Sequence, residues 1–472
     1  MCAHDRGVRS ATPFRLGRRQ LFQSALIAAA GAALPRCVRF HGSPPPPFPP
    51  NLPQTTPWPE ANAILAATMR PSFPNATFSL TDFGARGDGR ADNTGAFQSA
   101  IAACSGSGGG QVTVPAGVWL TGAIRLRSNV NLNLASGATI LFSGDARLYP
   151  PVLTRYEGIE CTNRSPMVYA LDETNIALTG SGTLDASWTA DWNTGSDRAG
   201  VLEPMVAKGL PPSERVVVGR LRSSFVEPYR CARVLIEGVK LVGARFWQLH
   251  PTLCTDVTIE NVTTSVSGEN TDACDPESCD RVVVRHCTLA SGDDNLALKS
   301  GRDDDGRRVG VACRNVVMMN CQAEGRFGFL TCGSEQTGGI ENVYAFNNWT
   351  YGHGVGSALW IKSNSQRGGF TRNVRLAAFK GSRLGSAVLA ATMTYGDQSG
   401  GWLPLFDDIQ LADVIVASAP MVVDLQGLAA DPIGSVLVRD SVFTDISGPL
   451  GRIQNAAPVS WSNVTVNGRG IG

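Results

Sequence analysis

The chain has 472 residues, of which 43% are hydrophobic and only 17% are charged, so it is long enough to bury a large core. Its 41 basic residues nearly balance its 40 acidic residues. The resulting formal net charge of +1 excludes a global field that would draw the chain to nucleic acid or to an anionic membrane surface. The 52 glycines and the low aromatic content of 7% favour a turn-rich, all-β protein over a helical one.

The start of the chain has the character of an export signal. Arg18 and Arg19 precede an apolar run from Ala25 to Leu34, which is too short to span a membrane stably. Twin arginines ahead of such a run are typical of a Tat-type signal, and an ordinary Sec signal or an N-terminal anchor is the alternative. We predict a Tat-like export signal over residues 1–32, a periplasmic or extracellular location, and no membrane association after processing.

A proline-rich stretch follows the predicted signal. The sequence from Ser43 to Pro50 is typical of a stiff polyproline spacer. We therefore predict a Pro-rich linker or N-terminal segment over residues 33–75 and a single catalytic domain over residues 76–472.

The predicted domain opens with one short helix and continues with strands only. Asp92 or Asn93 can cap this helix, and Gly108 to Gly110 end it. A β-strand is expected to begin at Gln111. The apolar face of the helix would carry Ala96, Phe97, Ala100 and Ile101.

Short β-patterned segments then recur with a common phase. From Val234 onward the repeat positions are 23 to 35 residues apart, which indicates a solenoid with one coil per repeat, each coil holding several short strands. The predicted fold is a parallel β-helix, because the strands of a β-sandwich would be spaced by 8–12 residues without a shared phase. The repeat positions are Val130, Ile176, Val234, Val257, Val282, Val316, Val343, Val374, Ile409, Val436 and Val459.

Six of the 12 cysteines share two positions of this repeat. Four of them come three residues before the repeat valine, and two come five residues after it. Equal phase predicts stacking of the thiols along the coils, or disulfides between neighbouring coils. A one-dimensional column cannot surround a tetrahedral ion, so we predict no structural metal. The first group is Cys231, Cys254, Cys279 and Cys313, and the second is Cys287 and Cys321.

Aspartates gather in the turns of two adjacent coils. Asp272 and Asp275 lie on one coil, and Asp293 and Asp294 lie on the next. Convergent carboxyls would suit an inverting glycosidase, which uses one as an acid and another as a base, about 6.5–9.5 Å apart. The alternatives are calcium binding or turn capping. The acidic run Asp303–Asp305 is predicted to be a solvated loop.

The chain from about Phe78 to its end resembles the polygalacturonases of glycoside hydrolase family 28. The motifs that carry this resemblance occur in the family's order. The resemblance implies a right-handed parallel β-helix that hydrolyses α-1,4 links between galacturonic acids with inversion, without a metal or other cofactor. The motifs are Asn270-Thr-Asp272 with Asp275-Pro-Glu-Ser278, Ser291-Gly-Asp-Asp294, Leu298-Lys-Ser-Gly301, Gly333-Ser-Glu335 with Gly338-Gly339, and Ile361-Lys362.

The resemblance also implies roles for individual residues. Asp293 would be the general acid. Asp272 and Asp294 would hold and activate the attacking water, with Asn270 supporting them. Lys362 would bind a carboxylate of the substrate.

Two positions depart from the family pattern. The family's Gly-His-Gly is Arg326-Phe327-Gly328 here, and its Arg-Ile-Lys is Trp360-Ile361-Lys362. The family histidine helps to set the protonation of the acid, and the arginine pairs with a substrate carboxylate. Trp360 can stack on an uncharged sugar, which points to a neutral residue such as rhamnose beside the cut. His353, one coil further on, is a candidate to face the same cleft; the alternative is an idle turn histidine.

Basic residues near the aspartates suit an anionic substrate. Any one of these arginines could be a solvated loop residue, but as a set they favour recognition of an acidic polymer. The insertion 301–308 is similar to that in exo-acting bacterial members of the family, so a loop there could close one end of the cleft. The residues are Lys299, Arg302, Arg307, Arg308, Arg326 and Arg367.

The sequence thus predicts an inverting, exo-acting hydrolase of pectic galacturonan, which we expect to be a monomer. One alternative is a hydrolase of rhamnogalacturonan or another mixed pectic backbone with the same fold. A second is a non-catalytic glycan-binding β-helix. A third, a calcium-dependent eliminase, would give unsaturated products that absorb ultraviolet light.

Overall fold

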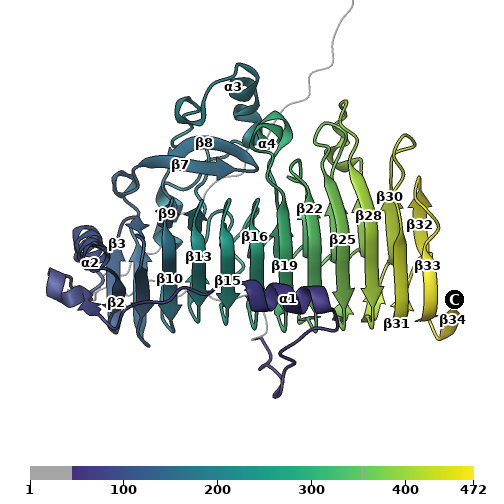
Figure 1. Ribbon diagram of the computed structural model, residues 1–472, viewed down its shortest axis with the longest axis horizontal. Coiled ribbons are helices and arrows are strands. Elements are labelled where there is room, and N and C mark those ends of the chain that lie inside the picture. The colour runs from purple at the N-terminus through teal and green to yellow at the C-terminus, as the bar shows by residue number, and fades with distance from the viewer. Residues whose placement is uncertain (1–44, 353) are drawn as a thin grey trace, which may run out of the picture. The chain divides into compact units, whose positions relative to one another are not determined.

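The computed structural model describes residues 45–472 except His353. Its strands stack in register as the successive coils of a parallel β-helix (Figure 1). Crossovers between parallel strands favour the right hand, because right-twisted strands pack back onto their sheet only that way. This architecture confirms the predicted fold class. The predicted signal and His353 lie outside the described residues. Within those residues, no helix is long and apolar enough to cross a membrane.

The largest sheet contains the predicted repeat positions except Val459, which directly precedes β33. Its register pairs Val234 with Val257, Val257 with Val282, and Val282 with Val316, so residues of equal phase lie on neighbouring coils as expected. Its main strands are β1 (Thr77–Ser79), β2 (Gly110–Val114), β5 (Val130–Leu134), β10 (Thr174–Gly180), β13 (Ala232–Glu237), β15 (Thr255–Glu260), β16 (Asp280–Arg285), β19 (Cys313–Met319), β22 (Ile340–Phe346), β25 (Phe370–Ala377), β28 (Leu405–Ala412), β31 (Val436–Ile446), β33 (Ser460–Val466) and β34 (Arg469–Ile471).

Short strands beyond the first turn of each coil continue the stack. Those of the C-terminal coils are β17 (Thr288–Ala290), β20 (Gln322–Glu324), β23 (Trp349–Thr350), β26 (Lys380–Arg383) and β29 (Ile415–Ala419). Those of the N-terminal coils are β3 (Gly117–Thr121), β6 (Ala138–Phe142), β11 (Thr183–Asp185) and β14 (Lys240–Val242).

A further face of the β-helix carries the candidate site. Between β12 and β18, two coils contribute single bridge residues, Leu249 and Cys274, in place of a strand. These bridges keep the coils in register. The strands of this face are β4 (Ile124–Arg125), β9 (Val168–Leu171), β12 (Val226–Tyr229), β18 (Leu296–Leu298), β21 (Gly328–Gly333), β24 (Ser357–Lys362), β27 (Ala387–Thr392), β30 (Met421–Gln426) and β32 (Gly451–Gln454). We call this face the cleft sheet.

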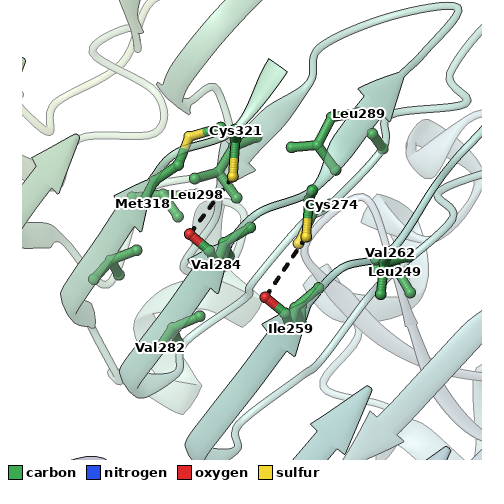
Figure 2. Close-up of a cluster of buried hydrophobic side chains, with 14 of the residues drawn as sticks. Leu249, Ile259, Val262, Cys274, Val282, Val284, Leu289, Leu298, Met318 and Cys321 are labelled. Atoms are coloured by element: carbon green, nitrogen blue, oxygen red, sulfur yellow. Dashed lines mark hydrogen bonds between the residues drawn. The ribbon is translucent and has the colours of Figure 1, made fainter. Parts of the chain in front are cut away.

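Aliphatic side chains fill the space inside the coils, and cysteines share it with them. Cys231 donates its backbone N–H to Cys254 Sγ, and Cys254 does the same to Cys279 Sγ, at 3.4 Å each. Cys321 bonds to the carbonyl of Val284 (Figure 2). The ten cysteines within the described residues are all buried free thiols, so the predicted stacking is confirmed and the alternative of disulfides is not seen there.

Two helices lie at the N-terminal part of the described chain. Helix α2 (Thr94–Gly106) buries Phe97, Ala100 and Ile101 as its pattern predicted. Helix α1 (Pro59–Ala67) lies within the predicted linker and contacts β16 and β19 of the largest sheet. Trp58, just before α1, packs on Tyr344 with ring centroids 5.6 Å apart. Residues around α1 therefore pack along the β-helix.

A two-stranded hairpin and two short helices stand over the cleft sheet. The hairpin consists of β7 (Pro151–Tyr156) and β8 (Ile159–Arg164), and the helices are α3 (Glu203–Ala207) and α4 (Asp303–Val309). Figure 1 shows the four elements grouped above the coils, with α4 beside the end of β8. We call this group the cap. It was not predicted as a unit from the sequence.

Candidate active site

Two turns of neighbouring coils bring the three predicted catalytic aspartates together. Asp272 lies just before the bridge at Cys274, and Asp293 and Asp294 form the turn before β18. A Cβ on Gly292 would lie 1.8 Å from the carbonyl oxygen of Gly268, so only glycine permits this close approach of the turns. Each aspartate offers a carboxylate oxygen within 4.8 Å of the others, which confirms the predicted convergence.

The observed spacing corrects one expectation. The nearest oxygens of the three carboxyls are closer than the 6.5–9.5 Å expected between the carboxyls of an inverting enzyme. The reason is that Asp272 and Asp294 belong to directly adjacent coils, which the bridge between Cys274 and Leu296 holds at one strand spacing. This contact between nearest oxygens is shorter than the separation of whole carboxyl groups, so the stereochemical course has to be measured from the products.

Asp294 is held by two donors. Its Oδ1 accepts the backbone N–H of Gly328 at 2.7 Å, and its Oδ2 accepts Lys362 Nζ at 2.8 Å. The bond to the lysine is charge-assisted, and the two donors together hold the carboxyl in one orientation. Asp294 is thus suited to orient a water molecule.

Asp293 lies in a different environment. It is half-buried, and its Oδ1 accepts only the backbone N–H of Asp294 at 3.0 Å. Burial, followed by the negative charge of Asp294, raises the pKa of Asp293. A raised pKa keeps a proton on this carboxyl at higher pH, as a general acid requires.

Asp272 is almost completely buried. Burial first, and the charge of Asp293 second, raise the pKa of Asp272 well above its usual range. The nearest cation is Lys299, whose Nζ lies 3.8 Å from Asp272 Oδ2. Lys299 directs its hydrogen bonds elsewhere, to the carbonyl of Gly333 at 3.1 Å and to Glu335 Oε2 at 3.2 Å.

These groups line a cleft with a volume of about 600 Å³ on the cleft sheet. The catalytic and substrate-binding candidates that the structure describes lie along it, with the exception of Arg307 and Arg308. The predicted residues in the lining are Asn270, Asp272, Asp293, Asp294, Lys299, Arg302, Arg326, Phe327, Trp360, Lys362 and Arg367.

The comparisons with known proteins agree with this geometry. The model of the family "Glycosyl hydrolases family 28" matches residues 104–418. The chain belongs to glycoside hydrolase family 28. It is therefore a glycoside hydrolase, as its catalytic motifs predicted.

Individual relatives come from plants and bacteria. The chain is 28% identical to a "Probable polygalacturonase" of Vitis vinifera, over 77% of this chain and 73% of that protein. It is 26% identical to an "Exo-poly-alpha-D-galacturonosidase" of Dickeya chrysanthemi, over 68% of this chain and 58% of that protein. A solved exopolygalacturonase of Thermotoga maritima is 36% identical, with a TM-score of 0.81 over 87% of this chain and 96% of that one.

Aromatic residues stand at the two positions where this family 28 chain departs from the pattern. The rings of Phe327 and Trp360 are 6.0 Å apart, and Tyr395 packs edge-on against Trp360 at 6.1 Å. Lys362 Nζ lies 4.0 Å from the centre of the Trp360 ring. Phe327 cannot donate or accept a proton, so the protonation of Asp293 rests on burial and on its charged neighbours.

Two arginines hold Asn270. Its Oδ1 accepts Arg222 Nη2 at 3.2 Å and also accepts Arg198. Arg198 in turn lies 3.5 Å from Glu157 at the tip of the hairpin. The support that Asn270 was expected to give the aspartates, and its role in substrate binding, stay predictions.

The other predicted basic residues fall into two groups. Lys299, Arg302 and Arg367 line the cleft but bond to protein carboxylates, while Arg326 is exposed and lies 5.2 Å from the Phe327 ring. Their substrate contacts stay predictions.

Arg307 and Arg308 are not part of the cleft lining, which corrects their expected place. Arg307 bonds to Asp304 at 2.7 Å and Arg308 to Asp305 at 2.8 Å, so both form ion pairs within helix α4.

The prediction of a solvated acidic run in α4 was wrong for two of its three residues. Asp303 and Asp305 are buried, whereas Asp304 is exposed as predicted. Asp305 accepts Arg215 Nη1 at 2.5 Å and the backbone N–H of Glu160 at 2.8 Å, in addition to Arg308. These partners offset the cost of burying the carboxylate and tie α4 to the hairpin and to the segment that carries α3.

The cap contributes Glu157 of the hairpin and Arg302 at the start of α4 to the lining of the cleft. Arg302, at the start of α4, bonds to Glu203 of α3 at 2.8 Å and to Glu157 of the hairpin at 3.4 Å. Arg155 of β7 is fully buried and bonds to Glu277 beneath it at 3.1 Å. The insertion 301–308 thus forms most of helix α4, which ion pairs join to the other elements of the cap, and its closure of the cleft stays a prediction.

Several lining residues were not predicted. Glu335, which accepts from Lys299, was quoted only as part of a motif, and Glu157, Arg198 and Tyr395 carried no signal at all. They come from the cap and from turns far along the chain. Only the three-dimensional stacking of coils brings them to the aspartates.

By distance alone, the three aspartates could hold a cation. Lys362 and Lys299 already place two positive charges at this cluster, and hard divalent cations need six or more oxygen ligands. The chemistry of the donor set therefore suits acid–base hydrolysis. The absence of a metal cofactor stays a prediction.

Proposed function

We propose that this family 28 hydrolase removes single galacturonate residues from the end of pectic galacturonan by inverting hydrolysis of α-1,4 links. The single observation that carries the proposal is the trio of aspartates in a cleft whose lining includes Glu157 and Arg302 of the cap. The two relatives named as exo-acting enzymes support it.

The three carboxyls have different roles in the proposed reaction. Asp293 protonates the oxygen of the leaving sugar, because its raised pKa keeps the proton available. Asp294, held by Lys362, and Asp272 orient a water molecule for attack on the anomeric carbon, and Asp272 acts as the base that accepts the proton this water releases. Direct attack by that water inverts the configuration.

Positive charge around the cleft would recognise the acidic sugar. Arg302 and Arg367 line it beside Asp303 of α4, and exposed Arg326 lines it next to Phe327. A uronate carboxylate would gain most from an arginine with a free guanidinium edge, because two parallel hydrogen bonds are then possible. Lys362 would act as a point charge beside the leaving sugar.

A specific observation favours a mixed pectic backbone as the second candidate. Beyond Trp360 the cleft continues into a hollow of about 250 Å³, lined by Ala390, Thr392 and Asp424 among others. The described residues of its lining include no basic side chain, and the carboxylate of Asp424 is bonded to Arg452 at 2.5 Å. An uncharged sugar would fit this hollow better than a free uronate.

Product analysis by proton NMR tests the proposal. Incubation with polygalacturonate should release galacturonate alone, with the β-anomer appearing first because inversion converts the α-link. Rhamnogalacturonan is run in parallel. Cleavage of rhamnogalacturonan alone would support the second candidate, and initial release of the α-anomer would contradict inversion. Binding without any product would favour a non-catalytic glycan-binding protein.

We also propose export through the Tat pathway, followed by release into the periplasm or the medium. The support is the position of Arg18 and Arg19 ahead of a short apolar run. Replacing both arginines by lysine should retain the full-length chain in the cytoplasm of a Tat-competent bacterial host, as measured by cell fractionation. Export of that variant at the normal rate would instead indicate a Sec signal.

A further inference from the structure

A fourth carboxyl lies beneath the catalytic aspartates. Asp275 is completely buried, three residues after Asp272 in the same turn. Neither of its side-chain oxygens accepts a hydrogen bond from any described donor, and Oδ1 of Asp272 also has none. A buried carboxylate without donors is costly, so this arrangement calls for an explanation.

The two carboxyls lie around the same ammonium group. Lys299 Nζ is 3.8 Å from Asp272 Oδ2 and 3.9 Å from Asp275 Oδ1, and the Asp272 carboxyl acts on Asp275 both through its charge and as a hydrogen-bonding neighbour. Two ionised carboxylates at this distance in a dry site repel each other strongly, whereas one proton between them makes a short, charge-assisted hydrogen bond. That single proton would give partners to an oxygen of each residue.

Burial and the neighbouring negative charges outweigh the one nearby cation. Lys299 Nζ is 3.9 Å from Asp275 Oδ1 and its charge lowers the pKa of Asp275, but its hydrogen bonds go to Gly333 and Glu335. On the preceding coil, His250 bonds to Ser224 and Glu277 and makes no hydrogen bond to Asp275.

The following coil adds the negative charge of Asp294 and the apolar Ala297. Burial first, and then the charge of Asp272, raise the pKa of Asp275 well above its usual range.

We propose that Asp275 is a positioning residue which stays protonated and donates a hydrogen bond to Asp272. The bond fixes the rotamer of Asp272 and stabilises its ionised form, so that its other oxygen can accept from the attacking water. Asp275 itself touches neither substrate nor water. The inference rests on the proposed role of Asp272 as a base and adds a second proton, distinct from that of Asp293, to the site.

Two near-isosteric variants of Asp275 test whether this residue acts as a hydrogen-bond donor or as a negative charge. Asp275→Asn retains a donor toward Asp272, so kcat should stay within about threefold of the wild type. Asp275→Leu has no donor, and kcat should fall by about 10- to 100-fold. Without the donor, the ionised form of Asp272 is less favoured and its pKa rises, so the acidic limb of the kcat/KM profile should move to higher pH in the leucine variant only.

An infrared measurement tests the protonation directly and does not depend on activity. The carbonyl band of a protonated carboxyl at neutral pH should be weaker in Asp275→Asn than in the wild type, while the thermal melting temperatures stay similar. An unchanged band, or an asparagine variant as impaired as the leucine variant, would overturn the proposal and show that Asp275 acts as an anion. If the infrared result holds but no substrate is hydrolysed, the proposed function fails and the shared proton stands.

Discussion

Replacing Asp293 by asparagine should lower kcat on the pectic substrate by about 10²- to 10⁴-fold, the usual contribution of a general acid. Asparagine keeps the shape of the side chain and can still bond to the backbone N–H of Asp294, so the fold of the turn should be preserved. What it lacks is a proton that can be transferred to the leaving oxygen. The measurement is initial-rate kinetics on purified protein.

Asp293 should also determine how activity depends on pH. Asp293 works in its protonated form, and its pKa is raised, so activity should persist to higher pH than for an ordinary aspartate and be lost as pH rises through that pKa. The asparagine variant should lose this alkaline limb. Asp397→Asn, on the exposed turn beside Tyr395, is a matched control that should retain full activity. Equal loss in both variants would indicate a general effect on this rim of the cleft instead.

The coil register could be predicted because a parallel solenoid repeats its geometry on every coil. A valine of equal phase must pair with the valine of the next coil, or every side chain of the strand would change face. The same reasoning placed Asp272 beside Asp293 and Asp294 without any coordinates. It also placed the thiols of Cys231 and Cys254 in one column.

The cap could not be predicted in this way because no local pattern encodes it. Arg155 and its partner Glu277 are 122 residues apart, and Arg215 meets Asp305 across 90 residues. A run of aspartates is normally solvated, and only these distant arginines make its burial in α4 tolerable. The sequence therefore predicted the aspartate trio more completely than the wall that limits access to it.

The ion pair that anchors the cap provides the second large expected effect. Arg155→Met should destabilise the protein by about 3–5 kcal/mol, because it leaves the fully buried carboxylate of Glu277 without its cation. Methionine fills most of the volume of the arginine stem, so the lost charge rather than a cavity dominates. The midpoint of urea unfolding measures the effect, and Arg147→Met is the control.

Arg147 pairs with Asp145 at 2.6 Å, but its side chain is 88% exposed, so its loss should leave the midpoint unchanged. Adding Glu277→Gln to Arg155→Met should recover part of the loss, since the uncompensated charge is then gone. An Arg155→Met midpoint as high as the control would mean that water reaches Glu277 beneath the hairpin.

The same variant connects the stability of the cap to the mode of cleavage. If the cap is what restricts the cleft to chain ends, then loosening β7 should let the polymer extend past Glu157, and oligomers should appear among the products at temperatures where the β-helix is still folded. If the Arg155→Met variant still releases galacturonate alone although its cap is destabilised, exo action has its origin elsewhere in the cleft. The hairpin would then stabilise the protein without determining the size of the product.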